Sequence, residues 1–212
     1  EKPQVGVAAG ATVREAMKMP MFYLLIVATG TLWFCITGVL QHQSVYLARD
    51  NGLEGVELAR AVSVFFGCSV VGKLIFGWLG DWFPKGQIML LSIVTIIAGL
   101  VFLRMVDGSN TLVLYAYAVV YGTGFAGTFT MVQLMIAELF AGPTYGRILG
   151  IFFFVDTLAA GTGISALGEI RVRMDSYIPA IDLMIGMCLV ATICVFAINR
   201  ITAKPLDIVP AE

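Results

Sequence analysis

Charged residues are scarce in this sequence. Only 13% of its 212 residues are Asp, Glu, Lys or Arg, whereas a soluble globular domain contains about 25%. Hydrophobic residues make up 59% of the chain, and its mean hydropathy is +0.92. These values exclude an ordinary soluble domain and predict a protein embedded in a lipid bilayer. The formal net charge of −1 also leaves no basic surface for phosphates, which argues against nucleic acid as a partner.

Histidine and cysteine are also few. The chain has one histidine and four cysteines, and the cysteines lie in apolar segments without a C-x-x-C pair. This pattern predicts no disulfide framework, no metal site and no cofactor. An intramembrane enzyme would need a nucleophile–base pair or an H-E-x-x-H motif, and neither is present, so we expect no enzymatic activity. The first residue is not Met, which leaves open that the chain is a fragment.

Six long apolar segments are present, and each is close to the roughly 20 residues that a helix needs to cross about 30 Å of hydrocarbon. They are residues 21–40, 59–79, 87–103, 111–136, 148–167 and 177–198. Lipid offers no partner for an open strand edge, so all six must be helices. We therefore predict an all-α membrane protein with six transmembrane helices in residues 21–198. Residues 1–20 are expected to form a cytoplasmic linker and short helix, and residues 199–212 a cytoplasmic tail.

Polar residues organise the connections. Thr12 and Glu15 fit a capping box, which predicts the start of the short helix. Residues 41–58 are expected to be a polar connection with a turn at 49–52. Six crossings place both ends on one side, which then carries seven Lys and Arg residues against five on the other. This small excess predicts that both termini are cytoplasmic. We expect the membrane to be the plasma (bacterial inner) membrane.

Two glycine-rich stretches imitate nucleotide-binding motifs. Gly122, Gly124 and Gly127 form a G-x-G-x-x-G pattern, but no strand precedes it and it lies within an apolar span. Residues 67–73 imitate a P-loop, although Leu74 occupies the position where Ser or Thr must bind magnesium. Both stretches are interpreted as glycines that allow close packing between membrane helices.

A spacing of four residues relates Gly77, Asp81 and Lys85 at the junction of the second and third spans. A glycine one turn before an acid suits a helix end that packs tightly on a neighbour, with the acid at the membrane edge. The pattern resembles the G-x-x-x-D-x-x-x-[RK] signature of the major facilitator superfamily of transporters. Residues 42–52 and the Ala-Glu-Leu-Phe segment at 137–140 further resemble its monocarboxylate and oxalate–formate exchanger branch.

This resemblance implies the C-terminal six-helix half of a twelve-helix transporter, itself a three-plus-three inverted repeat. It further implies an N-terminal six-helix half as partner, a shared central cavity and alternating access. The expected substrate is a small organic anion, namely a monocarboxylate, with proton coupling as an option. Two rival interpretations stay open: a transporter of a neutral or cationic solute, and a membrane scaffold that does not transport.

Charges inside apolar spans are costly, which makes Lys73 and Asp156 candidate substrate-binding residues. Lys73 could instead extend to the membrane surface. In the resembled branch, its position usually holds an arginine that binds the substrate carboxylate. Asp156 is too short to reach the surface, so it either makes an interhelical hydrogen bond or faces the cavity. If the two residues face each other, we expect them to pair in the empty site and to couple anion binding to proton uptake.

The remaining candidates are less specific. His42, Gln133 and Trp33 are candidate substrate-binding residues, although an interfacial or packing role is the alternative for each. A second group is expected at the cytoplasmic gate rather than at the substrate: Gly77, Asp81, Lys85, Glu138 and Arg147.

Overall fold

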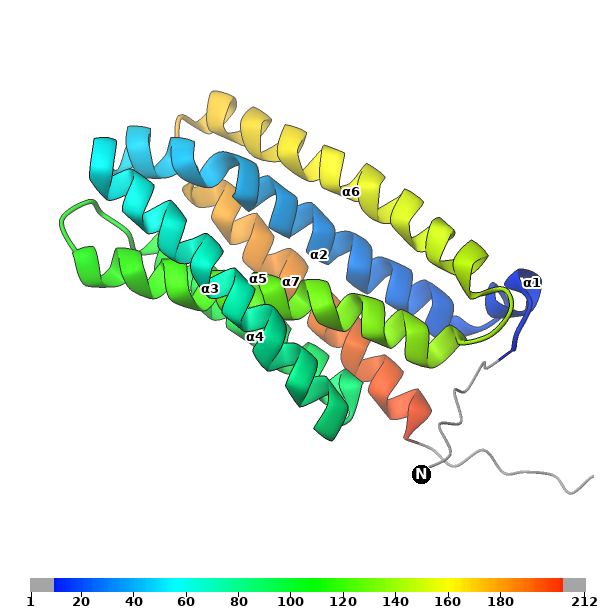
Figure 1. Cartoon of the computed structure of the whole chain (residues 1–212). Coiled ribbons are helices and arrows are strands. Elements are labelled where there is room, and N and C mark those ends of the chain that lie inside the picture. The colour runs from blue at the N-terminus through cyan, green and yellow to red at the C-terminus, as the bar shows by residue number, and fades with distance from the viewer. Residues whose placement is uncertain (1–9, 204–212) are drawn as a thin grey trace, which may run out of the picture.

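The computed structural model describes residues 10–203 and contains one short helix and six long ones, with no strand in that part of the chain (Figure 1). The helices are α1 (Val13–Ala16), α2 (Pro20–Val45), α3 (Gly55–Trp82), α4 (Lys85–Arg104), α5 (Thr111–Phe140), α6 (Tyr145–Met174) and α7 (Ile178–Thr202), with a π-helical segment η1 (Tyr46–Asp50) after α2. Each of the six long helices is apolar and long enough to cross a membrane. The prediction of an all-α protein with six spans is confirmed.

Most of the helices continue beyond their apolar segments. The expectation that residues 41–58 form a polar connection is wrong for its first half, because α2 and η1 remain helical as far as Asp50. Polar side chains end the burial of a helix in lipid, but they do not end its backbone hydrogen bonds. Two of the helical segments end next to a residue in the left-handed region: Gly52 has φ +66° after η1, and Asp175 has φ 51° after α6.

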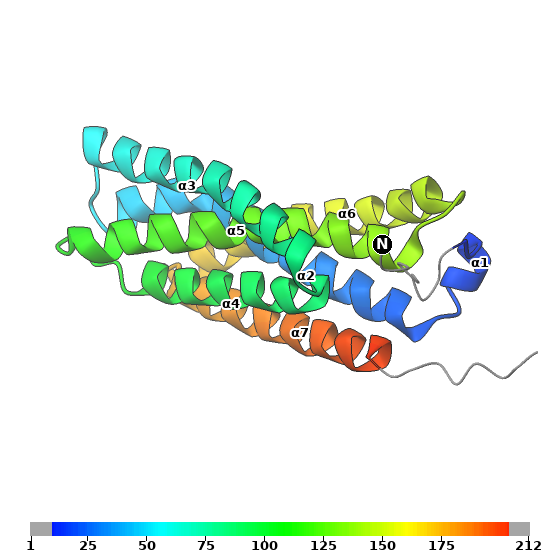
Figure 2. The same cartoon turned by 60° about the horizontal axis from the view of Figure 1, so that its bottom comes forward.

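Helix packing repeats after every third helix. α5 packs against α3 and α4, and α2 packs in the same way against α6 and α7. The two groups meet where α4 packs on α7. In Figure 2, α4 and α7 lie side by side along one edge of the bundle. Exchanging α2–α4 with α5–α7 leaves this pattern unchanged. Three crossings are an odd number, so the second group starts from the opposite side of the membrane, as an inverted repeat requires.

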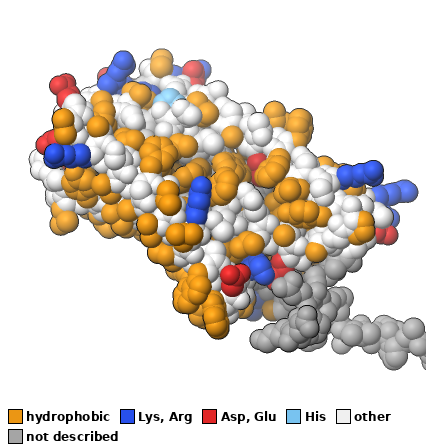
Figure 3. Space-filling model, in the orientation of Figure 1, with side chains coloured by type: hydrophobic (Ala, Val, Ile, Leu, Met, Phe, Trp, Pro, Cys, Tyr) orange, Lys and Arg blue, Asp and Glu red, His pale blue; other side chains and the backbone are white. Residues whose placement is uncertain are grey.

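Burial follows the same symmetry. In their most apolar stretches, α2 and α5 are each 50% buried, whereas α3 and α6 are each only 22% buried. α2 and α5 therefore form the centre of the bundle, and α3 and α6 leave most of their surface uncovered by this chain. Figure 3 shows that charged side chains of this face gather mainly toward the ends of the molecule, while its middle is mostly hydrophobic.

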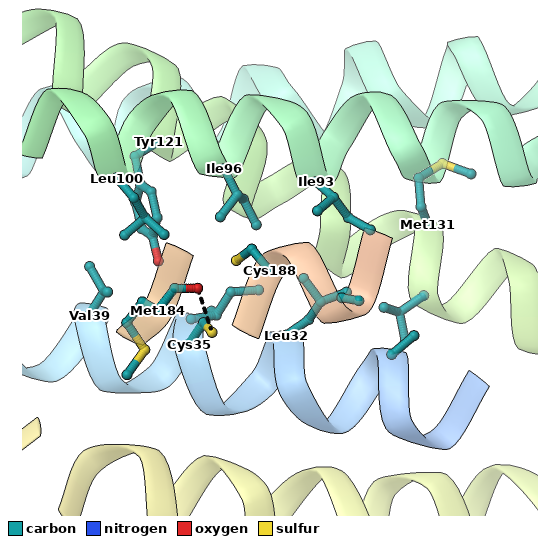
Figure 4. Close-up of a cluster of buried hydrophobic side chains, with 14 of the residues drawn as sticks. Leu32, Cys35, Val39, Ile93, Ile96, Leu100, Tyr121, Met131, Met184 and Cys188 are labelled. Atoms are coloured by element: carbon teal, nitrogen blue, oxygen red, sulfur yellow. Dashed lines mark hydrogen bonds between the residues drawn. The ribbon is translucent and has the colours of Figure 1, made fainter. Parts of the chain in front are cut away.

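The core lies where α2, α4, α5 and α7 meet (Figure 4). Leu32 and Cys35 of α2 face Ile96 of α4 and Cys188 of α7, and all four are fully buried or nearly so. The Cys35 thiol donates to the backbone oxygen of Met184 at 3.5 Å. These contacts hold α2, one of the helices that line the candidate site, against α4 and α7.

Glycines permit the closest helix contacts, as the sequence predicts. A Cβ on Gly122 would lie 2.5 Å from the Phe65 carbonyl oxygen, and one on Gly124 would lie 2.8 Å from the Ile96 nitrogen. A Cβ on Gly127 would meet the Phe76 ring at 2.6 Å. The packing role of this glycine motif is therefore confirmed, and it brings α5 against both α3 and α4.

The short helix α1 begins with the expected capping box. The Glu15 amide donates to Thr12 Oγ1 at 3.4 Å, and the Thr12 amide donates to Glu15 Oε2 at 2.8 Å. The bond from the Thr12 amide and a further one from the Thr12 hydroxyl lower the pKa of the Glu15 carboxyl, with the bond from the amide as the larger cause. Gly10 also donates to the Ala141 carbonyl at 2.7 Å, so the segment before α2 is attached to the link between α5 and α6.

Candidate functional site: a groove between α2, α5 and α6

One face each of α2, α5 and α6 borders a groove of about 280 Å³. Side chains three or four residues apart share a face of a helix, and the lining residues follow this spacing. They are Trp33 and Thr37 of α2, Phe129 and Gln133 of α5, and Phe153, Asp156, Thr157 and Ala160 of α6. The structure thus brings together three of the predicted substrate-binding residues, Trp33, Gln133 and Asp156.

Asp156 is the buried carboxylate of this groove. Its residue is only 4% exposed, and neither carboxylate oxygen has a hydrogen-bond partner among the described residues. The nearby Thr29 hydroxyl donates instead to the Ile26 carbonyl at 3.3 Å. A buried charge without a partner is strongly unfavourable, so Asp156 is suited to bind a proton or a solute.

Lys73 approaches the groove from α3. Its Nζ lies 4.9 Å from the centroid of the Phe129 ring, and Phe129 in turn contacts Trp33 edge-to-face with centroids 5.8 Å apart. The described residues contain no ion pair between Lys73 and Asp156, so the condition for their pairing, that the two residues face each other, is not met in this structure. An aromatic ring, rather than a carboxylate, is the neighbour of this ammonium group.

Close packing of α3 on α5 makes this contact possible. A Cβ on Gly72 would lie 2.9 Å from the Thr123 carbonyl oxygen, so only glycine fits there without a shift of the backbone. Gly72 faces α5, and Lys73, the next residue, is turned about 100° around the helix. The Lys73 side chain therefore leaves α3 at the edge of its contact with α5, where its ammonium group reaches the Phe129 ring.

His42 lies outside the groove. Its Nε2 is 3.0 Å from the Ile164 carbonyl oxygen, and its Nδ1 is 2.9 Å from the Tyr177 hydroxyl. A carbonyl only accepts, so Nε2 donates to it and Nδ1 accepts from Tyr177. Both ring nitrogens are thus used within the protein, and the structure does not bring His42 to the other predicted substrate-binding residues.

Tyr177 connects His42 to an ionic cluster at the same end of the bundle. The Arg171 guanidinium lies 5.6 Å from the Tyr177 ring centroid and donates to both Asp50 and Asp175. Asp50 also accepts from the Tyr177 amide at 3.4 Å. The cluster joins the end of η1 to the C-terminal end of α6 and the N-terminal end of α7.

The predicted gate residues lie at the opposite end, and two of them are in contact. Lys85 Nζ is 3.4 Å from Glu138 Oε2, which joins the start of α4 to the end of α5. Among the described residues, Asp81 and Arg147 have no ion-pair partner. A Cβ on Gly77 would meet nothing within 4 Å. Within this chain, Gly77 therefore does not make the tight contact that the motif suggested, and the neighbouring Gly80 packs on α5 instead.

Reasoning from the sequence missed most of the other residues that line the groove. Phe129, Phe153, Thr37 and Thr157 are ordinary residues for an apolar helix. Their only signal is position: Phe129, Phe153 and Thr37 lie three or four residues from a predicted site residue, and Thr157 lies four residues after Phe153.

Comparisons with known proteins agree with this architecture. The description Major Facilitator Superfamily belongs to a family model that matches residues 9–209. Protein spinster homolog 1 of Homo sapiens is 26% identical over 172 residues, covering 79% of this chain and 31% of that protein. Protein spinster homolog 3 of Danio rerio is 34% identical over 132 residues, covering 62% of this chain and 25% of that protein. The chain thus spans less than a third of either relative.

Neither relative's name refers to monocarboxylates or to oxalate–formate exchange. The assignment to that branch therefore stays a prediction from short motifs. The superfamily rests on a match over nearly the whole chain, together with six apolar helices in two equivalent groups of three. The chain belongs to the Major Facilitator Superfamily, whose members are transporters rather than enzymes, and it is a multi-pass integral membrane protein.

Proposed function

We propose that this chain is part of a secondary active transporter of a small organic anion, namely a monocarboxylate, that works by alternating access. The observation that carries the proposal is the position of Lys73. Its ammonium group lies within a membrane-spanning helix, beside an aromatic groove, and no carboxylate among the described residues neutralises it. A cation in this position supplies the counter-charge that a carboxylate needs in order to leave water.

The unpaired Asp156 favours a substrate with a single negative charge and transport that is coupled to protons. A dianion would approach an unpaired carboxylate in the same groove, which is unfavourable whenever Asp156 is ionised. A protonated Asp156 is neutral, and it can donate a hydrogen bond to the bound solute. Binding of the anion and of a proton would then favour each other, which gives symport; exchange of one anion for another is the alternative cycle.

The same groove supports a second candidate, a cationic solute. Asp156 together with the rings of Trp33, Phe129 and Phe153 offers a carboxylate and aromatic faces to a cation. We rank this candidate second because Lys73 would then repel the solute. In a membrane scaffold that does not transport, neither the charge of Lys73 nor that of Asp156 would have a role.

An N-terminal six-helix half is the proposed partner. α3 and α6 are symmetry-related helices, and each is only 22% buried in its most apolar stretch. A second six-helix half would cover them and close the cavity. We therefore expect this chain alone not to transport.

Both ends of the chain are proposed to be cytoplasmic, in the plasma membrane. The support is the excess of Lys and Arg on that side, seven against five. Labelling of a cysteine placed at Ser109, between α4 and α5, checks the orientation: an impermeant reagent should reach it only from outside.

The proposed substrate class is tested with the full-length transporter in liposomes. Labelled small monocarboxylates, amino acids and sugars are supplied separately. Lys73→Gln should abolish uptake of the monocarboxylate, whereas Lys73→Arg should keep part of it, because a cation remains. Arg60→Gln, on the exposed outer end of the same helix, is the matched control and should transport normally. Unchanged anion uptake by Lys73→Gln would contradict the proposal.

A further inference from the structure

We propose that Phe129 is a positioning residue for anion binding: its ring holds the Lys73 ammonium group at the groove, and so sets the affinity for the substrate. The inference rests on the proposed function, since Lys73 must bind the anion for its position to matter. Nothing in the sequence pattern distinguishes Phe129 from the other phenylalanines of the spans. Its role follows from its two contacts in the structure.

The first contact is with the cation. Lys73 Nζ lies 4.9 Å from the ring centroid, within the range of a cation–π interaction. Lysine has a long flexible side chain, and inside a membrane its alternative is to extend toward the nearer surface. Lys73 is exposed on α3, so packing alone does not hold its side chain in one place. The attraction to the ring face favours the conformation in which the charge stays beside the groove.

The second contact fixes the ring. Phe129 is partly buried, and Trp33 of α2 meets it edge-to-face at 5.8 Å with an interplanar angle of 76°. Its helix is held against α3 by Gly127, whose missing side chain accommodates the Phe76 ring. The ring therefore has a defined place between a cation from α3 and an indole from α2.

A ring suits this task better than a carboxylate would. A bound carboxylate would have to be displaced by every arriving anion, because both compete for the same charge. A ring face attracts the ammonium group without accepting its hydrogen bonds, so the N–H groups that point away from the ring stay free for the substrate. The missing Lys73–Asp156 pair is thus consistent with a binding site kept ready for an anion.

The test varies the ring's electrostatics while nearly conserving its size. Phenylalanine analogues with one, two and three ring fluorines replace Phe129 in the full-length transporter, and monocarboxylate uptake is measured in liposomes. Fluorine withdraws charge from the ring face and weakens its attraction for a cation. The KM for the anion should rise stepwise, by about 3- to 10-fold for the trifluorinated ring. Phe129→Leu should raise KM similarly, and Phe129→Tyr should leave it nearly unchanged.

Phe125 provides the matched control. It lies one turn before Phe129 on α5 and stacks on Phe65 with ring centroids 5.9 Å apart; it does not line the groove, and among the described residues no cation lies over its ring. Fluorination at Phe125 should leave the KM unchanged, which separates an effect on Lys73 from a general effect of ring fluorination on the protein. If Phe129→Leu fails to fold, the fluorinated series still decides, because it conserves the shape of the ring.

The possible outcomes separate the two proposals. Anion uptake by the unmodified protein with a KM independent of fluorination would overturn the role of Phe129 and leave the proposed function intact. The same rise in KM at Phe125 as at Phe129 would also overturn it. Absence of anion uptake by the unmodified protein would overturn the proposed function, and the role of Phe129 with it.

Discussion

Asp50 accepts a hydrogen bond from Arg171 Nη2 at 3.0 Å, although 121 residues separate the two in sequence. The contact joins the last turn of η1 to the last turns of α6, on the side of the molecule opposite the Lys85–Glu138 pair. Both side chains are largely shielded from solvent, with 16% of the Asp50 side chain and 25% of the Arg171 side chain exposed. The ends of the bundle are thus held by ion pairs, while its middle is held by apolar packing.

Loss of this pair should lower stability. In the full-length protein, Asp50→Asn should decrease the free energy of unfolding by about 1 kcal/mol, because Arg171 loses one of its two charged partners. Glu169→Gln is the matched control: its ion pair with Arg173 is 58% and 75% exposed and should contribute little. Thermal unfolding in detergent compares the two. Equal midpoints for both variants would refute the structural role of the pair.

A side chain at Gly122 should force α5 away from α3. The added Cβ of Gly122→Ala would lie 2.5 Å from the backbone oxygen of Phe65, which cannot move without shifting α3. We expect a loss of about 1–3 kcal/mol, the usual cost of overpacking. Gly186→Ala in α7 is the control, since its Cβ would meet nothing within 4 Å. The apparent midpoint of thermal unfolding should fall for the first variant only.

Asp81 should affect switching between the two access states more than substrate binding. It is exposed in the last turn of α3, four residues before Lys85 in sequence, and it does not line the groove. Asp81→Asn in the full-length transporter should slow uptake while leaving the apparent substrate affinity nearly unchanged. Rates and concentration dependence measured in liposomes separate the two effects. A large loss of affinity at normal turnover would place Asp81 at the substrate instead.

Asp156 should couple transport to protons. Asp156→Asn keeps the size of the side chain and removes its titration, so accumulation driven by a pH difference should be lost. Exchange of internal for external substrate should survive, because it requires no net proton movement. Both assays use the same liposomes, with and without internal substrate. A variant that still concentrates its substrate when only a pH difference is applied would exclude Asp156 as the coupling residue.

Asp107 should make the link between α4 and α5 sensitive to acid. The Ser109 hydroxyl, together with the Ser109 and Asn110 amides, donates to its carboxylate and lowers its pKa. A lowered pKa in the folded state contributes stability above the unfolded value of about 3.9, and that contribution is lost as the pH falls through the folded value. Asp107→Asn retains an acceptor oxygen but cannot titrate. The difference in unfolding midpoint between wild type and variant should therefore shrink on acidification, and a constant difference would contradict this.

The spans were predictable because the lipid environment imposes one rule on all of them. A segment of apolar residues long enough to cross the bilayer must be a helix, which sufficed for the number and type of elements. Their ends were not predictable in the same way. His42 and Arg171 lie in helical turns past the apolar stretches, and their hydrogen bonds to distant residues could not be inferred from hydropathy.

For the candidate site, too, the sequence indicated some of the residues but not what they contact. Charge in an apolar span marked Lys73 and Asp156, and the groove does contain Asp156 with Lys73 near its Phe129 wall. The sequence could not show what each charge faces, since that depends on the rotation of α3 against α5. Close packing at Gly72 sets this rotation, and it directs Lys73 to a ring instead of to the acid.

The repeat of two groups of three helices has a consequence for Lys73 and Asp156 during a transport cycle. Lys73 and Asp156 lie on α3 and α6, which correspond when the first three long helices are exchanged with the last three. In a protein of this symmetry, the two groups of three helices can exchange conformations during a transport cycle. Because both charges border one groove, a movement that opens the groove to one aqueous compartment should expose both of them to it together. The anion and the proton would then enter from the same side and leave on the other, because the chain carries one charge on each of two equivalent helices.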